Sequence, residues 1–277
     1  MAVFDNHFHL RSDGRGVAAV KEFLKAGGTH LLLTHAPHSD IPVRDGGDYV
    51  LAFDRTLTLA ERARRDTTAG VFVALGPYPV EIISLAERLG IAAAKEALLS
   101  GLEVAAEHVR EGRAIALGEI GRPHFPVPPE ILAASNEVLE HGMRLAKEVE
   151  CAVILHAEDP TESTFAEWST TARRVGLPPE RVVKHHSTPL ITAGERTGVW
   201  PSLLAKEDTV APALAEGTRF LLETDYMDDP RRPGAVLGPA TVPRKTRLWR
   251  EKGLLTEGAA HAIHEENPRR VYGIDLA

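Results

Sequence analysis

Ala2-Val3-Phe4-Asp5-Asn6-His7-Phe8-His9 is the first apolar run of the chain, and it ends in two histidines that stand two residues apart. On an extended strand, side chains at positions i and i+2 point to the same face, so both imidazoles can bind one cation. Later apolar runs also end in residues that can bind a metal, and these are Glu119, His156, His185, His186 and Asp225. One such residue at each of several strand ends is what a metal site at the mouth of a barrel requires.

Short runs rich in Val, Leu, Ile and Ala alternate with longer amphipathic segments, which predicts strand–helix units and a parallel sheet. We expect eight strands, at 3–7, 30–34, 71–76, 114–119, 152–156, 181–185, 198–201 and 219–224. Periodicity predicts helices at 17–25, 50–65, 80–89, 91–110, 130–149, 161–175 and 206–215. The fold class is therefore α/β, with residues 1–277 as a single TIM (β/α)8 barrel domain, regular or distorted. Its active site is expected at the C-terminal ends of the strands.

The charge balance limits the partners that the protein can bind, and the single cysteine indicates its cellular compartment. Lysine and arginine total 32 and the acidic residues 39, so the formal net charge is −7. No basic footprint remains for stable binding of duplex nucleic acid, and an anionic substrate must be bound by local groups. The single cysteine, Cys151, excludes an intrachain disulfide framework and fits a reducing cytoplasm. Because no apolar run reaches the length of a membrane span and no leader pattern is present, we expect a cytoplasmic protein without a membrane partner.

Each strand-end residue also has an ordinary structural explanation. The chain holds 13 histidines, and a single histidine at a strand end is more often hydrogen-bonded than metal-bound. Glu119 alone can pair with an arginine, and Asp225 alone can cap the segment that follows it. These explanations fail jointly, because all strand C-termini of a parallel barrel lie on one face, and that face carries the active site in essentially all characterised barrels.

Four pieces of sequence together resemble the ordered motifs of TatD-type metal-dependent hydrolases, within the amidohydrolase superfamily. They are Asp5-Asn6-His7-Phe8-His9, Gly118-Glu119-Ile120-Gly121, the strand ends at His156 and His185, and Glu223-Thr224-Asp225. The resemblance spans nearly the whole chain and is closer to an archaeal-like branch, through Val183-Lys184-His185-His186 and residues 228–234. Tyr78 and Glu158 stand where bacterial members typically carry a histidine and an arginine, so nuclease activity stays open.

The resemblance implies a binuclear site with two divalent metal ions. The residues that it assigns to the metals are His7, His9, Glu119, His156, His185 and Asp225. The first two histidines and Asp225 would hold one ion, the last two histidines the other, and Glu119 would bridge them. Asp225 and Glu119 are then the catalytic candidates, because Asp225 would also orient or deprotonate the attacking water. Such mixed ligands suit zinc, manganese, iron or nickel, among which the sequence does not choose.

The sixth strand leaves one ambiguity about the ligand that it supplies. If Val183 points into the barrel, then so does His185, whereas a shift of one residue places His186 there instead. We predict that His185 is the ligand and that His186 contacts the ligands or the substrate.

Hydrolysis by metal-activated water is the expected chemistry. A bound metal lowers the pKa of water from about 15.7 toward ~7, and the chain lacks the glycine-rich motifs of dinucleotide, phosphate-loop and serine-hydrolase sites. We predict a phosphoester substrate, which is a small phosphate ester or a single-stranded nucleic acid. Hydrolysis of an amide, lactone or carboxylester at the same site is the alternative, and a catalytically silent metal-binding protein is another.

Four residues beside the predicted site are candidates for substrate binding: Arg122, His124, Arg231 and Arg232. Two follow the fourth strand and two lie in the long loop after the eighth strand, so fixed donors there can hold a phosphate or carboxylate. The alternative is that the arginines pair with Asp228, Asp229 or Glu158 and make these loops rigid. The oligomeric state stays open, a homo-oligomer included.

Overall fold

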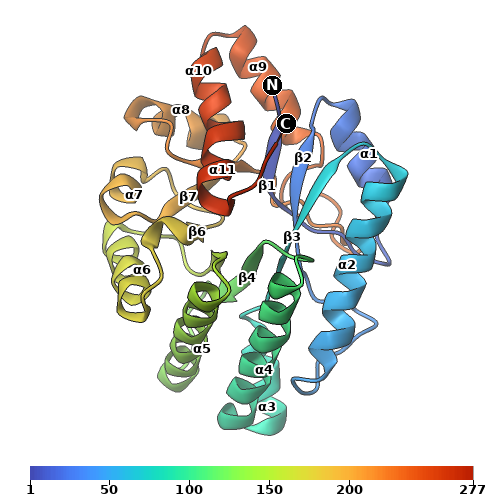
Figure 1. Cartoon of the computed structure of the whole chain (residues 1–277), viewed down its shortest axis with the longest axis vertical. Coiled ribbons are helices and arrows are strands. Elements are labelled where there is room, and N and C mark those ends of the chain that lie inside the picture. The colour runs from blue at the N-terminus through green and yellow to red at the C-terminus, as the bar shows by residue number, and fades with distance from the viewer. Residues whose placement is uncertain (277) are drawn as a thin grey trace.

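Eight parallel strands follow one another in sequence order around a nearly closed barrel, and helices pack on its outside (Figure 1). The computed structural model describes residues 1–276. The strands are β1 (Phe4–Phe8), β2 (His30–Thr34), β3 (Gly70–Leu75), β4 (Ala116–Gly121), β5 (Ala152–His156), β6 (Val182–Lys184), β7 (Trp200–Leu204) and β8 (Leu221–Glu223). This arrangement confirms the predicted TIM-barrel fold.

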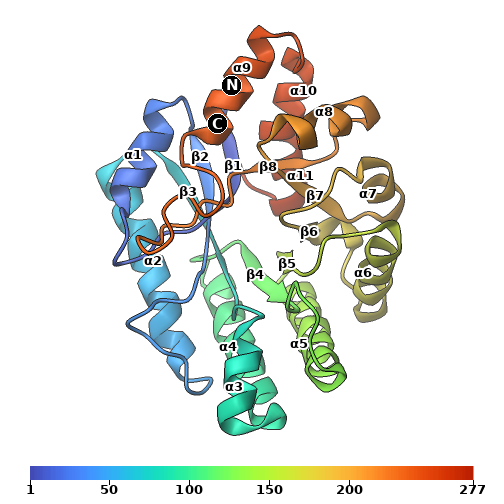
Figure 2. The ribbon, with the colours of Figure 1, turned by 180° about the vertical axis from the view of Figure 1, so that it is seen from behind.

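Helices connect the consecutive strands and also follow the last one (Figure 2). Between strands lie α1 (Val17–Lys25), α2 (Asp48–Asp66), α3 (Glu81–Leu89), α4 (Ile91–Arg110), α5 (Pro129–Glu148), α6 (Glu162–Val175), the 3-10 turn η1 (Pro179–Arg181), α7 (Ile191–Thr197) and α8 (Glu207–Glu216). After β8 come α9 (Thr241–Glu251), α10 (Glu257–His261), the π-helical turn η2 (Ala262–Glu266) and α11 (Asn267–Tyr272). No helix within residues 1–276 has both the length and the apolar character that crossing a bilayer requires.

The barrel interior is apolar toward the N-terminal ends of the strands. Its core is built from inward side chains of successive strands, namely Phe4, Leu32, Ala74, Ala116, Ala152, Ile154, Val183, Trp200 and Leu221. The residues of α11 close this end, where the ring centroid of Tyr272 lies 6.5 Å from that of Phe4. The polar residues of the predicted site therefore lie at the opposite end, where the strands finish.

The first and last strands meet through few backbone contacts and one buried carboxylate. Phe8 forms an isolated parallel bridge with Tyr226. The backbone N–H and the hydroxyl of Thr224 donate to Asp5 at 2.9 and 2.7 Å. Burial raises the pKa of Asp5 to about 7 against these hydrogen bonds. This side chain thus joins β1 to the end of β8 beneath the predicted site.

Register irregularities in two strands turn extra side chains into the barrel. The pairing of β1 with β2 shifts after Asp5, and the pairing of β4 with β5 shifts after Gly118. Asn6 and Gly118 face the interior, where Asn6 bonds to other interior side chains. Strict alternation would then turn the next residues, His7 and Glu119, outward. The shifts let both point inward, as bulges beside active sites commonly do.

The seventh strand lies at Trp200–Leu204 instead of the predicted 198–201. Gly198 ends α7 in a left-handed conformation with φ 91°, so the extended strand begins only after it. Helix α7 itself escaped prediction because it has seven residues and contains Gly194. A Cβ at Gly194 would lie 2.9 Å from the carbonyl oxygen of Val199, so glycine lets this helix pack tightly against the strand that follows.

Candidate metal centre

Six side chains from five strand ends converge at the mouth of the barrel. They are the predicted ligands His7, His9, Glu119, His156, His185 and Asp225. All are buried except His156, which is partly exposed. The structure therefore brings every predicted ligand into one cluster.

Glu119 lies at the centre of this cluster. Its Oε1 atom is 2.8 Å from Nε2 of His7 and 3.3 Å from Nε2 of His185. Its Oε2 atom is 3.3 Å from Nδ1 of His156. One carboxylate thus contacts imidazoles from three strands, which is the position expected of a bridging ligand.

Three overlapping groups of possible ligand atoms lie at this centre among the described residues, and one of them is formed by His7, His185 and Glu223. The other two match the predicted ligand sets. The ligand atoms of His7, His9 and Asp225 lie within 4.8 Å of one another. Those of Glu119, His156 and His185 do so as well. Buried imidazoles and carboxylates at this spacing are the donors that divalent transition metals prefer, so these residues fit such ions.

Burial and neighbouring charges set the protonation of the cluster. Burial disfavours a charge on His7, but Glu119, Glu223 and Asp225 together raise the pKa of His7 to about 9. Burial, followed by the charge of His7, lowers the pKa of His185 to about 4. Burial also opposes ionisation of Glu119, yet His185 and the other histidines hold its pKa well below the usual range. At pH 7 and without a metal, Glu119 is therefore a carboxylate and His185 a neutral imidazole, the forms that bind metals, whereas His7 carries a proton that it must lose when a metal binds.

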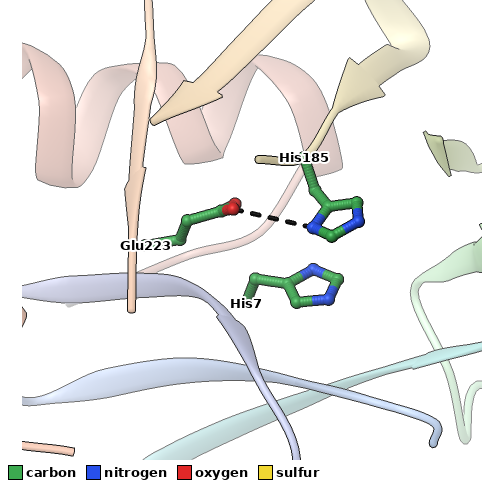
Figure 3. Close-up of side chains that lie close together, drawn as sticks. All are labelled: His7, His185 and Glu223. Carbon is green, nitrogen blue, oxygen red and sulfur yellow. Dashed lines mark ion pairs between the residues drawn. The ribbon is translucent and has the colours of Figure 1, made fainter. Parts of the chain in front are cut away.

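Glu223 is a buried residue of the site that we did not predict as a site residue (Figure 3). Its Oε1 atom faces Nδ1 of His185 at 3.6 Å and accepts the backbone N–H of His186 at 2.7 Å. Its Oε2 atom accepts a short hydrogen bond from Ser202. The alternation of β8 already contains the signal, because Leu221, Glu223 and Asp225 fall on the inward face.

The turn after β6 decides between the two neighbouring histidines. His185 points into the cluster, as predicted, because Val183 lies in the barrel core. His186 is about half exposed, and its Nδ1 atom lies 3.3 Å from Oδ2 of Asp225. Both His186 and Asp225 adopt left-handed backbone conformations, with φ 48° and 49°. Such conformations are uncommon outside glycine and concentrate at functional sites.

A cavity of about 780 Å³ opens above the cluster. Its wall includes Tyr78, whose ring centroid lies 5.1 Å from that of His156, and residues of the loop after β8. Of the four predicted substrate-binding residues, His124, Arg231 and Arg232 line this cavity. His124 also contacts a predicted ligand, since its Nδ1 atom is 2.9 Å from Nε2 of His156.

The arginines beside the site all pair with acidic residues. Arg122 is buried and makes a two-point contact with Glu158 at 2.5 and 2.9 Å and another ion pair with Glu167 at 2.9 Å. The structure does not place it among the residues that line the cavity. Arg231 and Arg232 lie 3.0 and 3.3 Å from Asp229 while remaining at the cavity wall. The pairing alternative therefore describes Arg122, and the other two arginines combine pairing with access to the cavity.

Comparison with known proteins agrees with this geometry. A family model described as TatD related DNase matches residues 4–273. The uncharacterized protein MJ1127 of Methanocaldococcus jannaschii is 40% identical over 283 residues, which cover 100% of this chain and 97% of the relative.

Two solved structures from Escherichia coli share the fold. The TatD homolog YJJV is 21% identical, with a TM-score of 0.66 over 98% of each chain. The phosphotriesterase homology protein, complexed with phosphate in its active site, is 12% identical, with a TM-score of 0.65 over 98% of each chain. The family match and the cluster of metal-binding side chains together lead to one conclusion. The chain belongs to the TatD-related DNase family and is a metal-dependent hydrolase.

Proposed function

We propose that this protein hydrolyses phosphoesters with water activated by two divalent ions. One observation carries the proposal: the buried carboxylate of Glu119 belongs to one group of possible ligand atoms, with His156 and His185, and also contacts His7 of another group. His7, His9 and Asp225 would hold one ion, and the histidines of β5 and β6 the other. Zinc, manganese, iron and nickel all suit these ligands.

Asp225 is the residue that we assign to water activation. Divalent ions at the site would supply Lewis acidity and make water a stronger acid. The Oδ1 atom of Asp225 is 3.5 Å from Nε2 of His9, and Oδ2 is 3.3 Å from Nδ1 of His186. The carboxylate is thus held from both sides and can orient water and accept its proton. His186, about half exposed, can pass that proton to solvent.

Three features favour a phosphoester over other substrates. His124, Arg231 and Arg232 give the cavity wall donors and positive charge that suit an anion. The family model is that of TatD related DNase, and a structural neighbour holds phosphate in its active site. We therefore propose a small or single-stranded anionic substrate, bound by residues 1–277 acting as one hydrolase domain.

Hydrolysis of a lactone or carboxylester is the second candidate. A structural neighbour described as engineered for organophosphate hydrolysis from a weak promiscuous lactonase template has a TM-score of 0.66 at 14% identity. The same fold can therefore carry either chemistry, and the reaction products must distinguish them.

The test is a panel of phosphomonoesters, phosphodiesters, single-stranded oligonucleotides, lactones and carboxylesters, assayed with metal-reconstituted protein. We expect turnover of a phosphoester, lost on chelation and reduced about 10²–10⁴-fold in Asp225→Asn. Asp208→Asn, on the exposed surface of α8, is the matched control and should keep full activity. Turnover confined to lactones or carboxylesters would contradict the proposal.

A further inference from the structure

Lys184, on β6 next to His185, is a buried lysine that lacks an ion pair. Its relative exposure is 1%. Across residues 1–276 no carboxylate forms an ion pair with its ammonium, whose hydrogen bond goes to the carbonyl oxygen of His185 at 2.5 Å. Lysines are almost never fully buried unless paired, because an unpaired buried charge is costly. The described residues therefore give this buried cation a hydrogen bond but no counter-ion.

The position of Lys184 at the cavity indicates a role for its positive charge. Lys184 lines the cavity above the candidate metal centre, as do Ala157, Asp159 and His186. The acidic groups that act on it are Glu223, Glu119, Asp159 and Glu158. None of them bonds to it directly, and Glu158 is already paired with Arg122.

The ammonium of Lys184 has donors to spare. An ammonium carries three N–H donors, and the described structure gives one of them a partner. Divalent ions held by Glu119 would cancel the attraction between that carboxylate and Lys184. The ammonium would then lack a neighbouring counter-charge until an anionic substrate binds, and two of its donors would be available to that anion.

We propose that Lys184 binds the phosphoryl group of the substrate by donating to a non-bridging oxygen, and that the substrate class is a phosphomonoester. This inference rests on the proposed phosphoester hydrolysis at the same site. A fixed cation beside the metal centre favours a dianionic phosphomonoester over a monoanionic diester and over an uncharged ester or lactone. Such a role also accounts for the missing counter-ion, because the substrate supplies it.

The experiment uses the full chain reconstituted with zinc and measures binding of inorganic phosphate by titration calorimetry. Lys184→Met keeps the length of the side chain and removes its charge, so we expect phosphate affinity to fall at least about tenfold. Zinc content should stay unchanged. The melting temperature of the zinc-free variant should equal or exceed that of the wild type, because an unpaired buried charge is gone. Lys25→Met, on the exposed surface of α1, is the control and should change none of these values.

A second variant keeps the test usable if Lys184→Met does not fold. Lys184→Gln can still donate to the carbonyl oxygen of His185 but carries no charge, so it should show the same loss of phosphate affinity. Unchanged phosphate affinity in a folded, zinc-loaded variant would overturn the role of Lys184, even if the wild type hydrolyses phosphoesters. A wild type that binds phosphate through Lys184 without turning over any phosphoester would instead contradict the proposed function and support only the anion site.

A kinetic comparison tests the substrate class. Among active proteins, hydrolysis of p-nitrophenyl phosphate should fall more in Lys184→Met than hydrolysis of bis(p-nitrophenyl) phosphate. The reverse order would contradict the monoester assignment.

Discussion

Glu223 lies outside the residues that line the cavity but contacts a predicted metal ligand, His185. It is fully buried, and its carboxylate faces Nδ1 of His185, the nitrogen on the far side of the ring from Glu119. A carboxylate behind a metal-binding imidazole fixes the tautomer and the orientation of the ring. The hydroxyl of Ser202 and the backbone N–H of His186 hold this carboxylate in place.

Replacing Glu223 by glutamine should weaken metal binding without unfolding the protein. The amide has the same shape and can keep contacts to Ser202 and His186, but it carries no charge toward His185. We expect the affinity for zinc to fall about 10–100-fold, as measured by competition with a chromogenic chelator. Glu251→Gln, on the exposed surface of α9, is the control. Equal zinc affinity in a folded Glu223→Gln variant would show that this carboxylate does not support His185.

The sequence located the six predicted ligands because each follows an apolar run at a strand end. It offered Glu158 as one possible partner of the arginines but did not decide between pairing and a substrate clamp for Arg122. The choice between a substrate clamp and an ion pair depends on where Glu158 and Glu167 lie in space, and Glu167 is on α6, well beyond the strand end that carries Arg122. Side-chain contacts between different elements depend on how those elements pack, and a single sequence does not predict this packing.

Elements with strong periodicity and clear ends were predicted to the residue. Helices α1 and α4 begin directly after Gly16 and Gly90, and their bounds match the predicted 17–25 and 91–110. Strand β4 begins two residues later than predicted, at Ala116, because strand bounds depend on the ladder formed with a neighbour. The register shifts in β1 and β4 also arise from pairing between strands, so no local sequence pattern predicts them.

The π-helical turn η2 should make the protein sensitive to acid through His264. This side chain is fully buried, and its ring nitrogens lie 3.2 Å from the backbone nitrogen of Phe4 and 2.9 Å from Oγ1 of Thr246. Burial lowers the pKa of His264 to about 4 from its ordinary 6.5. Between these values the unfolded chain binds a proton that the folded protein does not. Stability should therefore fall as pH drops from 6.5 to 4, with about 3 kcal/mol of that loss due to His264.

Urea denaturation of His264→Gln at several pH values checks this expectation. The variant should lose less stability than the wild type between pH 6.5 and 4, because one titrating group is gone. His261→Gln, about half exposed on the adjoining helix α10, should keep the acid sensitivity of the wild type. A His264→Gln variant whose stability falls as steeply as that of the wild type would assign the acid sensitivity to other groups.

The two ends of the barrel have different roles, because one end holds an apolar core and the other holds the candidate metal centre. The apolar core and α11 occupy one end, where residues near both termini pack together (Figures 1 and 2). The candidate metal centre occupies the other end, where the strands finish. Alternation of strands and helices predicted this architecture, since consecutive parallel strands connected by helices form neighbours in a sheet. Contacts between the loops at the mouth of the barrel were harder to predict from the sequence. Asp228, in the loop after β8, accepts backbone N–H groups of Arg15 and Gly16 at 2.8 Å, which joins loops from opposite ends of the chain.

The proposed hydrolysis depends on divalent metal at the mouth of the barrel, and elemental analysis of the purified, reconstituted protein measures this metal directly. We predict about two divalent ions per chain, falling on replacement of His185 or Asp225 by alanine. His141→Ala, on the outer surface of α5, should leave the metal content unchanged. A wild-type protein that binds no divalent ion after reconstitution with zinc, manganese, iron or nickel would contradict the proposed metal-dependent hydrolysis.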